Sequence, residues 1–189
     1  MTTTIKRQAA KAGLSSRVQE LSGVDFSLCY QCKKCSSGCP VSGITVSPPA
    51  EIIRRLQLGA GDELLENDMV WLCLSCETCY NRCPMHINTG AVIDALRQLA
   101  LEKGARMPKS KIPLFNSAFL KTVQMFGRSY DLPALATYKL GSGHLMDDME
   151  KLPAMLKKGK LAITPPSGGD SKIVKTIFEN VKKKKGTSK

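Results

Sequence analysis

The sequence has no long apolar run. Its best uninterrupted stretch, from Met69 to Leu74, is far shorter than the roughly 18 residues that a membrane helix needs. No apolar segment follows the basic residues Lys6, Arg7 and Lys11 near the N-terminus, as a secretory signal would require. We therefore expect a cytoplasmic protein without a membrane span, in which thiols stay reduced.

Groups that many enzyme sites use are also scarce. The chain has only two histidines, His86 and His144, and neither stands in a pattern typical of a catalytic triad. The nucleotide-binding and hydrolase motifs G-x-G-x-x-G, the P-loop and G-x-S-x-G do not occur. We predict no independent active site in this chain, so that any flavin or nucleotide would lie on another protein.

Aromatic residues make up only 5% of the chain, although its net charge is +12. The charge is uneven, because residues 1–104 hold 11 basic and 10 acidic side chains whereas residues 105–189 hold 17 and 6. Few aromatic residues stand among the basic ones, and no DNA- or RNA-binding signature is present, so nucleic acid is not the expected partner. An anionic protein surface suits the basic half better.

Cysteine, in contrast, is concentrated in one region. All eight cysteines lie in residues 29–83, and the first four recur with a constant offset of 44 residues, which indicates an internal duplication. Each repeat reads C-x-x-C-x-x-C-x-x-x-C-P. This is the run of bacterial two-cluster ferredoxins, in which the fourth cysteine binds the other cluster.

The spacing has a physical reason. Three cysteines two residues apart can wrap a tight loop around one face of a cubane, while Pro40 and Pro84 disfavour helix before them and turn the fourth cysteine toward the neighbouring loop. We therefore predict two 4Fe-4S clusters that share ligands crosswise. The predicted ligands are Cys29, Cys32, Cys35 and Cys83 for one cluster and Cys39, Cys73, Cys76 and Cys79 for the other.

Nearby charges suggest that the two clusters differ. Lys33, Lys34 and Arg82 flank ligands of the first cluster, whereas Glu77 stands among ligands of the second. Positive charge favours the reduced, more anionic cluster. The hypothesis from sequence is that the first cluster has the higher reduction potential.

Zinc is the main alternative metal. Eight cysteines would serve two tetrahedral zinc ions in a structural or nucleic-acid-binding module. Zinc does not explain the third cysteine at fixed spacing or the proline after the fourth, both of which occur twice. Disulfides are disfavoured by the expected reducing compartment.

Hydrophobic periodicity predicts an all-α fold, because apolar residues recur at helical spacing and no alternating strand pattern competes. We divide the chain into a cluster-binding domain over residues 1–104, a basic helical extension over 105–163, and a flexible linker with a basic tail over 164–189. The predicted helical segments are residues 48–58, 62–66, 88–103, 113–126, 132–140, 147–156 and 173–181.

Four stretches carry a resemblance to a known family: CYQCKKCSSGCPVSG, WLCLSCETCYNRCPMHI, NTGAVIDALRQLALEKG and FLKTVQMFGRSYDL. They resemble the alpha-helical ferredoxin domain and, over about residues 20–160, are most similar to the C subunit of heterodisulfide reductase. The resemblance implies that the N-terminal domain has the alpha-helical ferredoxin fold. It also implies an oxidoreductase complex in which the flavoprotein of that family takes up electrons and this chain passes them to the catalytic, Cys-rich protein of the complex.

The catalytic protein of that family uses adjacent cysteine pairs, and this sequence has none, so we expect the disulfide chemistry on the partner and the basic half as the docking surface. By family, the disulfide would be that of coenzyme M and coenzyme B in methanogens, but bacterial relatives in anaerobic or sulfur metabolism use other substrates. The iron–sulfur protein of another anaerobic dehydrogenase remains an alternative.

Overall fold

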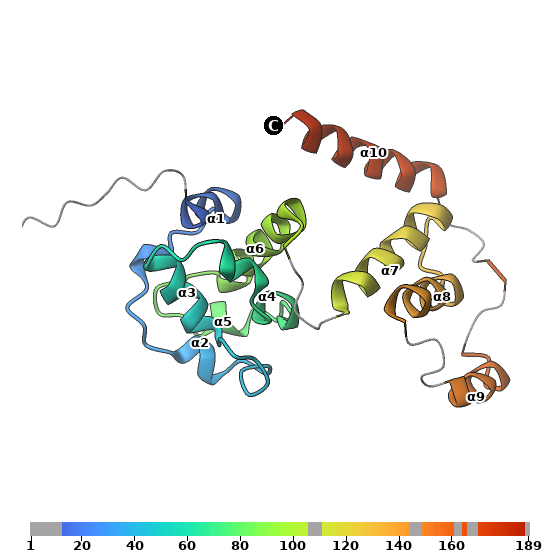
Figure 1. Cartoon of the computed structure of the whole chain (residues 1–189), viewed down its shortest axis with the longest axis horizontal. Helices are drawn as coiled ribbons and strands as arrows, with labels where there is room; N and C mark the ends of the chain where they lie inside the picture. Colours follow the sequence, from blue (N-terminus) through green and yellow to red (C-terminus); the bar gives the residue numbers. More distant parts are fainter. Residues whose placement is uncertain (1–12, 106–110, 144–148, 161–163, 166–169, 188–189) are drawn as a thin grey trace, which may run out of the picture. The chain divides into compact units, whose positions relative to one another are not determined.

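A computed structural model describes residues 13–105, 111–143, 149–160, 164–165 and 170–187 (Figure 1). Helices are the only regular elements within these ranges, which confirms the predicted all-α class. The chain forms two units, Met1–Ser110 and Lys111–Lys189. None of the described helices is long and apolar enough to cross a bilayer.

The first unit is built around its longest helix, α6. The Asn88 side chain begins this helix by accepting a hydrogen bond from the Ala91 amide at 2.9 Å, and Gly104 ends it in a left-handed conformation. Leu96 and Leu99 on α6 are completely buried, and each such side chain contributes about 1.5–3 kcal/mol. The helices of this unit are α1 (Leu14–Ser22), η1 (Phe26–Leu28), α2 (Lys34–Ser37), α3 (Pro49–Gln57), η2 (Asp62–Glu66), α4 (Met69–Leu72), α5 (Thr78–Asn81) and α6 (Thr89–Lys103).

Helix α3 covers the same core from another side. Its buried face is formed by Ile52, Ile53 and Leu56, as the apolar spacing predicts. Helix α1 was not predicted from the sequence, yet it packs against both α3 and α6. Its Ser15 hydroxyl donates to the Leu56 carbonyl at 2.7 Å, and its Val18 is fully buried. The core therefore includes a helix that precedes the cysteine motifs.

The second unit consists of α7 (Ile112–Phe126), α8 (Asp131–Ser142), η3 (Met149–Lys151), α9 (Leu152–Lys157) and α10 (Ser171–Thr187). Helices α7 and α8 approach closely at Gly141, where a Cβ atom would lie 3.0 Å from a methyl carbon of Leu114. The rings of Phe115 and Tyr138 meet edge to face at 5.8 Å across the same pair of helices. Helix α10 also packs against α7.

The predicted helices differ from the observed ones mainly at their ends. Residues 62–66 form a 3-10 helix, and the expected helix at 147–156 is replaced by η3 and α9, with residues 144–148 outside the described part. The C-terminal amphipathic segment is longer than the predicted 173–181. Of the predicted linker and tail over residues 164–189, residues 164–165 and 170–187 are described.

Candidate metal centre

The two cysteine loops have the same backbone course. In each loop, a short helix ends at the first cysteine, η1 before Cys29 and α4 before Cys73. Another short helix, α2 or α5, begins immediately before the third cysteine and contains it. These elements repeat with the offset of 44 residues that relates the cysteines. The duplication seen in the sequence is therefore also a duplication of structure.

Both loops contain strained residues at equivalent positions. Gln31 and Lys33 in the first loop have φ angles of 63° and 61°, and Ser75 and Glu77 in the second have 51° and 57°. A left-handed conformation costs a residue other than glycine of order 1–3 kcal/mol and persists only where the surroundings hold it. Four such residues beside the cysteines indicate that the surrounding fold holds both loops in this shape.

The cysteines line two cavities, and each cavity draws on both loops. The first cavity, with an empty volume of about 340 Å³ including its solvent-open part, is lined by Cys29, Cys32, Cys35 and Cys83. The second, of about 370 Å³ on the same measure, is lined by Cys39, Cys73, Cys76 and Cys79. Each cavity thus receives three thiols from one loop and one thiol from the other, and the two cavities are nearly equal in size.

Apolar side chains from the core close the inner walls of both cavities. Ile53 of α3 and Ile87 line the first cavity, and Met69 of α4 and Ile93 of α6 line the second. An apolar wall limits water access and lowers the local dielectric, which are two means by which a protein tunes a bound metal group. The helices that form the core also form the back of the site.

The thiols are not all in the same environment. Burial raises the pKa of the half-buried Cys35, Cys73 and Cys79 thiols, because a thiolate loses hydration there. The exposed Cys76 differs, since its contact with the Thr78 hydroxyl at 3.4 Å lowers its pKa. Iron bound in the cavities would supply the positive charge that half-buried thiolates require.

The donor set fits an iron–sulfur cluster. All eight cysteines are free of disulfides, and four soft sulfur donors surround each cavity, as a 4Fe-4S cluster requires. Among the described residues, no three His, Cys, Asp or Glu side chains converge on a position for one metal ion. The thiols are spread instead around two larger spaces.

The first loop is held by a side chain that the sequence did not single out. The amide nitrogen of Gln57, at the end of α3, donates to the carbonyl oxygens of Phe26, Ser27 and Cys29 at 3.1, 3.2 and 2.8 Å. Gln31 in turn places its amide nitrogen 3.3 Å from the Cys29 sulfur. These contacts fix the turn that leads into Cys29.

Arg97 on α6 holds the second loop in the corresponding way. Its Nε donates to the Val70 carbonyl at 2.6 Å, one Nη donates to the Cys73 carbonyl, and the other donates to the Ser75 hydroxyl at 3.2 Å. The same guanidinium makes an ion pair with Asp94 at 2.9 Å. Arg97 therefore connects the core helix to the backbone of Cys73, a candidate ligand.

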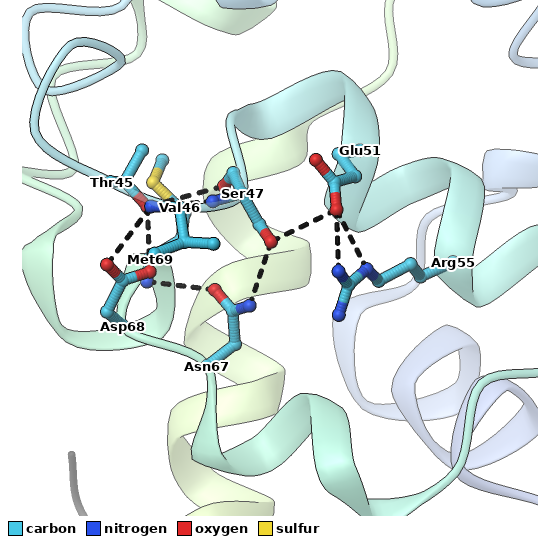
Figure 2. A network of polar contacts seen from close by, with 8 residues as sticks. All are labelled: Thr45, Val46, Ser47, Glu51, Arg55, Asn67, Asp68 and Met69. Carbon is cyan, nitrogen blue, oxygen red and sulfur yellow. Dashed lines mark hydrogen bonds and ion pairs between the residues drawn. The ribbon is translucent and has the colours of Figure 1, made fainter.

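A third set of polar contacts joins the segments that approach the second cavity (Figure 2). The Asp68 carboxylate accepts from the Thr45 hydroxyl at 2.8 Å and from the Val46 amide at 3.1 Å. The Asn67 amide donates to the hydroxyl of the buried Ser47 at 3.0 Å, and that hydroxyl donates to Glu51 at 3.2 Å. This network attaches the chain after Cys39 to the chain before Cys73.

Two of the charged residues named from the sequence line the cavities. Lys33 lines the first cavity and Glu77 the second. Arg82 precedes Cys83, a residue of the first cavity, and its side chain lies against Gly38, where a Cβ atom would fall 2.6 Å from its Nη1. Since Gly38 precedes Cys39, the Arg82 side chain also lies near a residue of the second cavity.

The comparisons with known proteins agree on one family. A family model described as a 4Fe-4S dicluster domain matches residues 25–87. The chain is 30% identical over 158 residues to the C2 subunit of the H(2)/formate:CoB-CoM heterodisulfide,ferredoxin reductase of Methanococcus maripaludis. This alignment covers 82% of this chain and 73% of that protein. It is 33% identical over 89 residues to a protein of Archaeoglobus profundus described as similar to the C subunit of heterodisulfide reductase, over 47% of each chain.

A shorter match of higher identity is to the iron–sulfur C subunit of the CoB–CoM heterodisulfide reductase of Methanopyrus kandleri, with 42% identity over 76 residues. This alignment covers 40% of each protein, so the chain spans less than half the length of that curated relative.

Proposed function

Since the chain belongs to the family of heterodisulfide reductase C subunits, we propose that it relays electrons within a complex of that type. Its 4Fe-4S dicluster domain makes it an iron–sulfur electron-transfer protein. When bound, each cluster would supply reversible storage of one electron. The chain's own contribution is to hold two such groups close together in a fixed orientation.

We propose the crossed ligand assignment for these clusters. One would be held by Cys29, Cys32, Cys35 and Cys83, and the other by Cys39, Cys73, Cys76 and Cys79. The grouping of the same cysteines around two cavities is the observation that carries this proposal. Because each loop serves both cavities, the clusters would be neighbours, and an electron could pass between them without any part of the chain moving.

The exposed ends of the loops are suited to contact with partner proteins. Tyr30 and Leu74 occupy equivalent positions between the first two cysteines of each loop and are 60% and 66% exposed. An apolar side chain beside each site lets a partner exclude water where electrons enter or leave. The proposed partners are a heterodisulfide reductase-like flavoprotein as the electron donor and a Cys-rich catalytic protein of the same complex, on which the disulfide is reduced.

The basic residues of 105–163 are the proposed docking surface for these partners. The terminal acceptor is either the coenzyme M–coenzyme B disulfide or another substrate of anaerobic or sulfur metabolism. The names of the relatives favour a heterodisulfide acceptor. The second candidate function is the iron–sulfur protein of another anaerobic dehydrogenase.

Purification without oxygen tests the metal assignment directly. We expect brown protein with about eight iron and eight sulfide per chain. Colourless protein with about two zinc and no inorganic sulfide would refute the relay and favour a structural zinc module. The partner proposal is tested by anaerobic affinity purification of the tagged chain from its own cells. A flavoprotein that co-purifies and reduces the clusters supports it, and recovery of the chain alone with its clusters refutes it.

A further inference from the structure

We infer that Arg97 makes the two cluster sites electrostatically unequal and raises the reduction potential of the cluster in the second cavity. This inference rests on the proposed function, because it concerns the clusters that the cysteines would hold. It deepens that function by naming a side chain that determines how the electron is shared between the two sites.

The argument begins with an equivalence between the two loops. Gln57 binds the carbonyl oxygens of Phe26 and Cys29, and Arg97 binds those of Val70 and Cys73. The two pairs of carbonyls are related by the offset of 44 residues. Gln57 and Arg97 therefore perform the same structural task, one from α3 and the other from α6.

The two side chains differ in charge. Gln57 is neutral, whereas Arg97 carries a positive charge. The Arg97 side chain is only 23% exposed, so solvent screens its charge less than that of a surface arginine. Its hydrogen bond to the Cys73 carbonyl places this charge next to a ligand of the second cavity. The first loop has no such charge from Gln57.

Two carboxylates oppose Arg97 in part. Asp94 pairs with it but is 53% exposed, and Glu77 lines the second cavity from an exposed position. Charges exposed to water are screened more than partly buried ones. The guanidinium therefore retains a net effect on the cavity, and removal of Asp94 should increase that effect.

The consequence concerns the one-electron step of the relay. Reduction adds one electron, received from the donor protein and later passed to the acceptor, and one negative charge to the group that the four thiolates hold. A nearby positive charge favours the reduced form. Lys33 and Lys34 favour a higher reduction potential for the cluster in the first cavity. The Arg97 charge opposes this difference, because it raises the potential of the other cluster.

The test is a redox titration of the anaerobically purified full-length holoprotein, followed by electron paramagnetic resonance. Arg97→Gln should lower one midpoint potential by about 59 mV or more, a tenfold change in the ratio of reduced to oxidised cluster. The affected signal should be the one that Cys39→Ala removes. Arg97→Lys, which keeps the charge, should restore at least half of the shift, and Asp94→Asn should move the same midpoint upward.

Arg54→Gln is the matched control, because it removes an arginine from an exposed position on α3 and should leave both midpoints unchanged. Unchanged midpoints in Arg97→Gln with full iron and sulfide would overturn the inference, as would equal shifts in Arg97→Lys and Arg97→Gln. Should Arg97→Gln fail to retain its clusters, an unchanged midpoint in Asp94→Asn overturns it instead. Absence of sulfide from the unmodified protein would refute the proposed function itself, which is a different result.

Discussion

Cys39 provides the sharpest test of how the two loops share their ligands. It follows the first three cysteines in sequence, but it lines the second cavity together with Cys73, Cys76 and Cys79. Cys39→Ala removes one of the four thiols around that cavity. Because a 4Fe-4S cluster needs a ligand for each iron, we expect the loss of between about one and four of about eight iron atoms.

Double variants identify which cluster has been lost. Cys32 and Cys76 are matched partners for this purpose, since they hold equivalent positions in the two loops and both are exposed. Cys39→Ala with Cys76→Ala affects one cavity twice and should retain about four iron per chain. Cys39→Ala with Cys32→Ala affects both cavities and should retain less than either single variant.

Iron and sulfide analysis and the amplitude of the reduced-cluster spectrum measure this outcome, and circular dichroism checks that each variant remains helical. The reverse pattern, in which the pair with Cys32 keeps more iron than the pair with Cys76, would refute crossed ligands. That pattern would mean that each repeat binds its own cluster independently.

Three further predictions concern the residues around the site and the second unit. Asp68→Ala removes an acceptor of two hydrogen bonds, at 2.8 and 3.1 Å, and should lower the free energy of unfolding in anaerobic urea titration by about 1–3 kcal/mol; no change would contradict its role in the network. Gln57→Leu keeps the size of the side chain but removes the amide that donates to three carbonyls, so a chelator should remove iron from the first cavity faster, with iron affinity reduced about 10–100-fold, while the second cavity keeps its iron. Gly141→Val crowds α7 and should destabilise the second unit by about 1–3 kcal/mol without altering iron content, and a loss of iron would show that the units are coupled.

The sequence predicts the long helices well because their signals are local. Helix α6 has its cap at Asn88, its stop at Gly104 and its apolar face in one continuous segment. Helix α1 was missed for a related reason: Gly13 precedes it without a side-chain cap, and its stability comes from contacts with α3 and α6. Leu14, Val18 and Leu21 do stand at helical spacing, but three apolar residues in a nine-residue segment without a cap are too weak a signal to predict a helix on their own.

The candidate ligands could be identified from spacing, but their supports could not. Gln57 and Arg97 bind carbonyls 24 to 31 residues away in the chain, and a backbone carbonyl has no residue type that a sequence pattern could reveal. Asp68 and Thr45 are likewise joined across 23 residues. The position of Arg82 over Gly38 also required the fold, because sequence proximity pointed to Cys83 alone.

Because each cavity draws thiols from both loops, the order in which the ribosome adds the cysteines determines when each set of four thiols is complete. The first cavity begins with Cys29 but gains its fourth thiol only at Cys83, and the second gains its own at Cys79. A nascent chain that ends before residue 79 therefore has neither donor set complete, and both become complete within a few residues of each other. Under the proposed crossed assignment, neither cluster could be completed before the second repeat is made, and a chain that ended between the repeats would lack a full donor set for both.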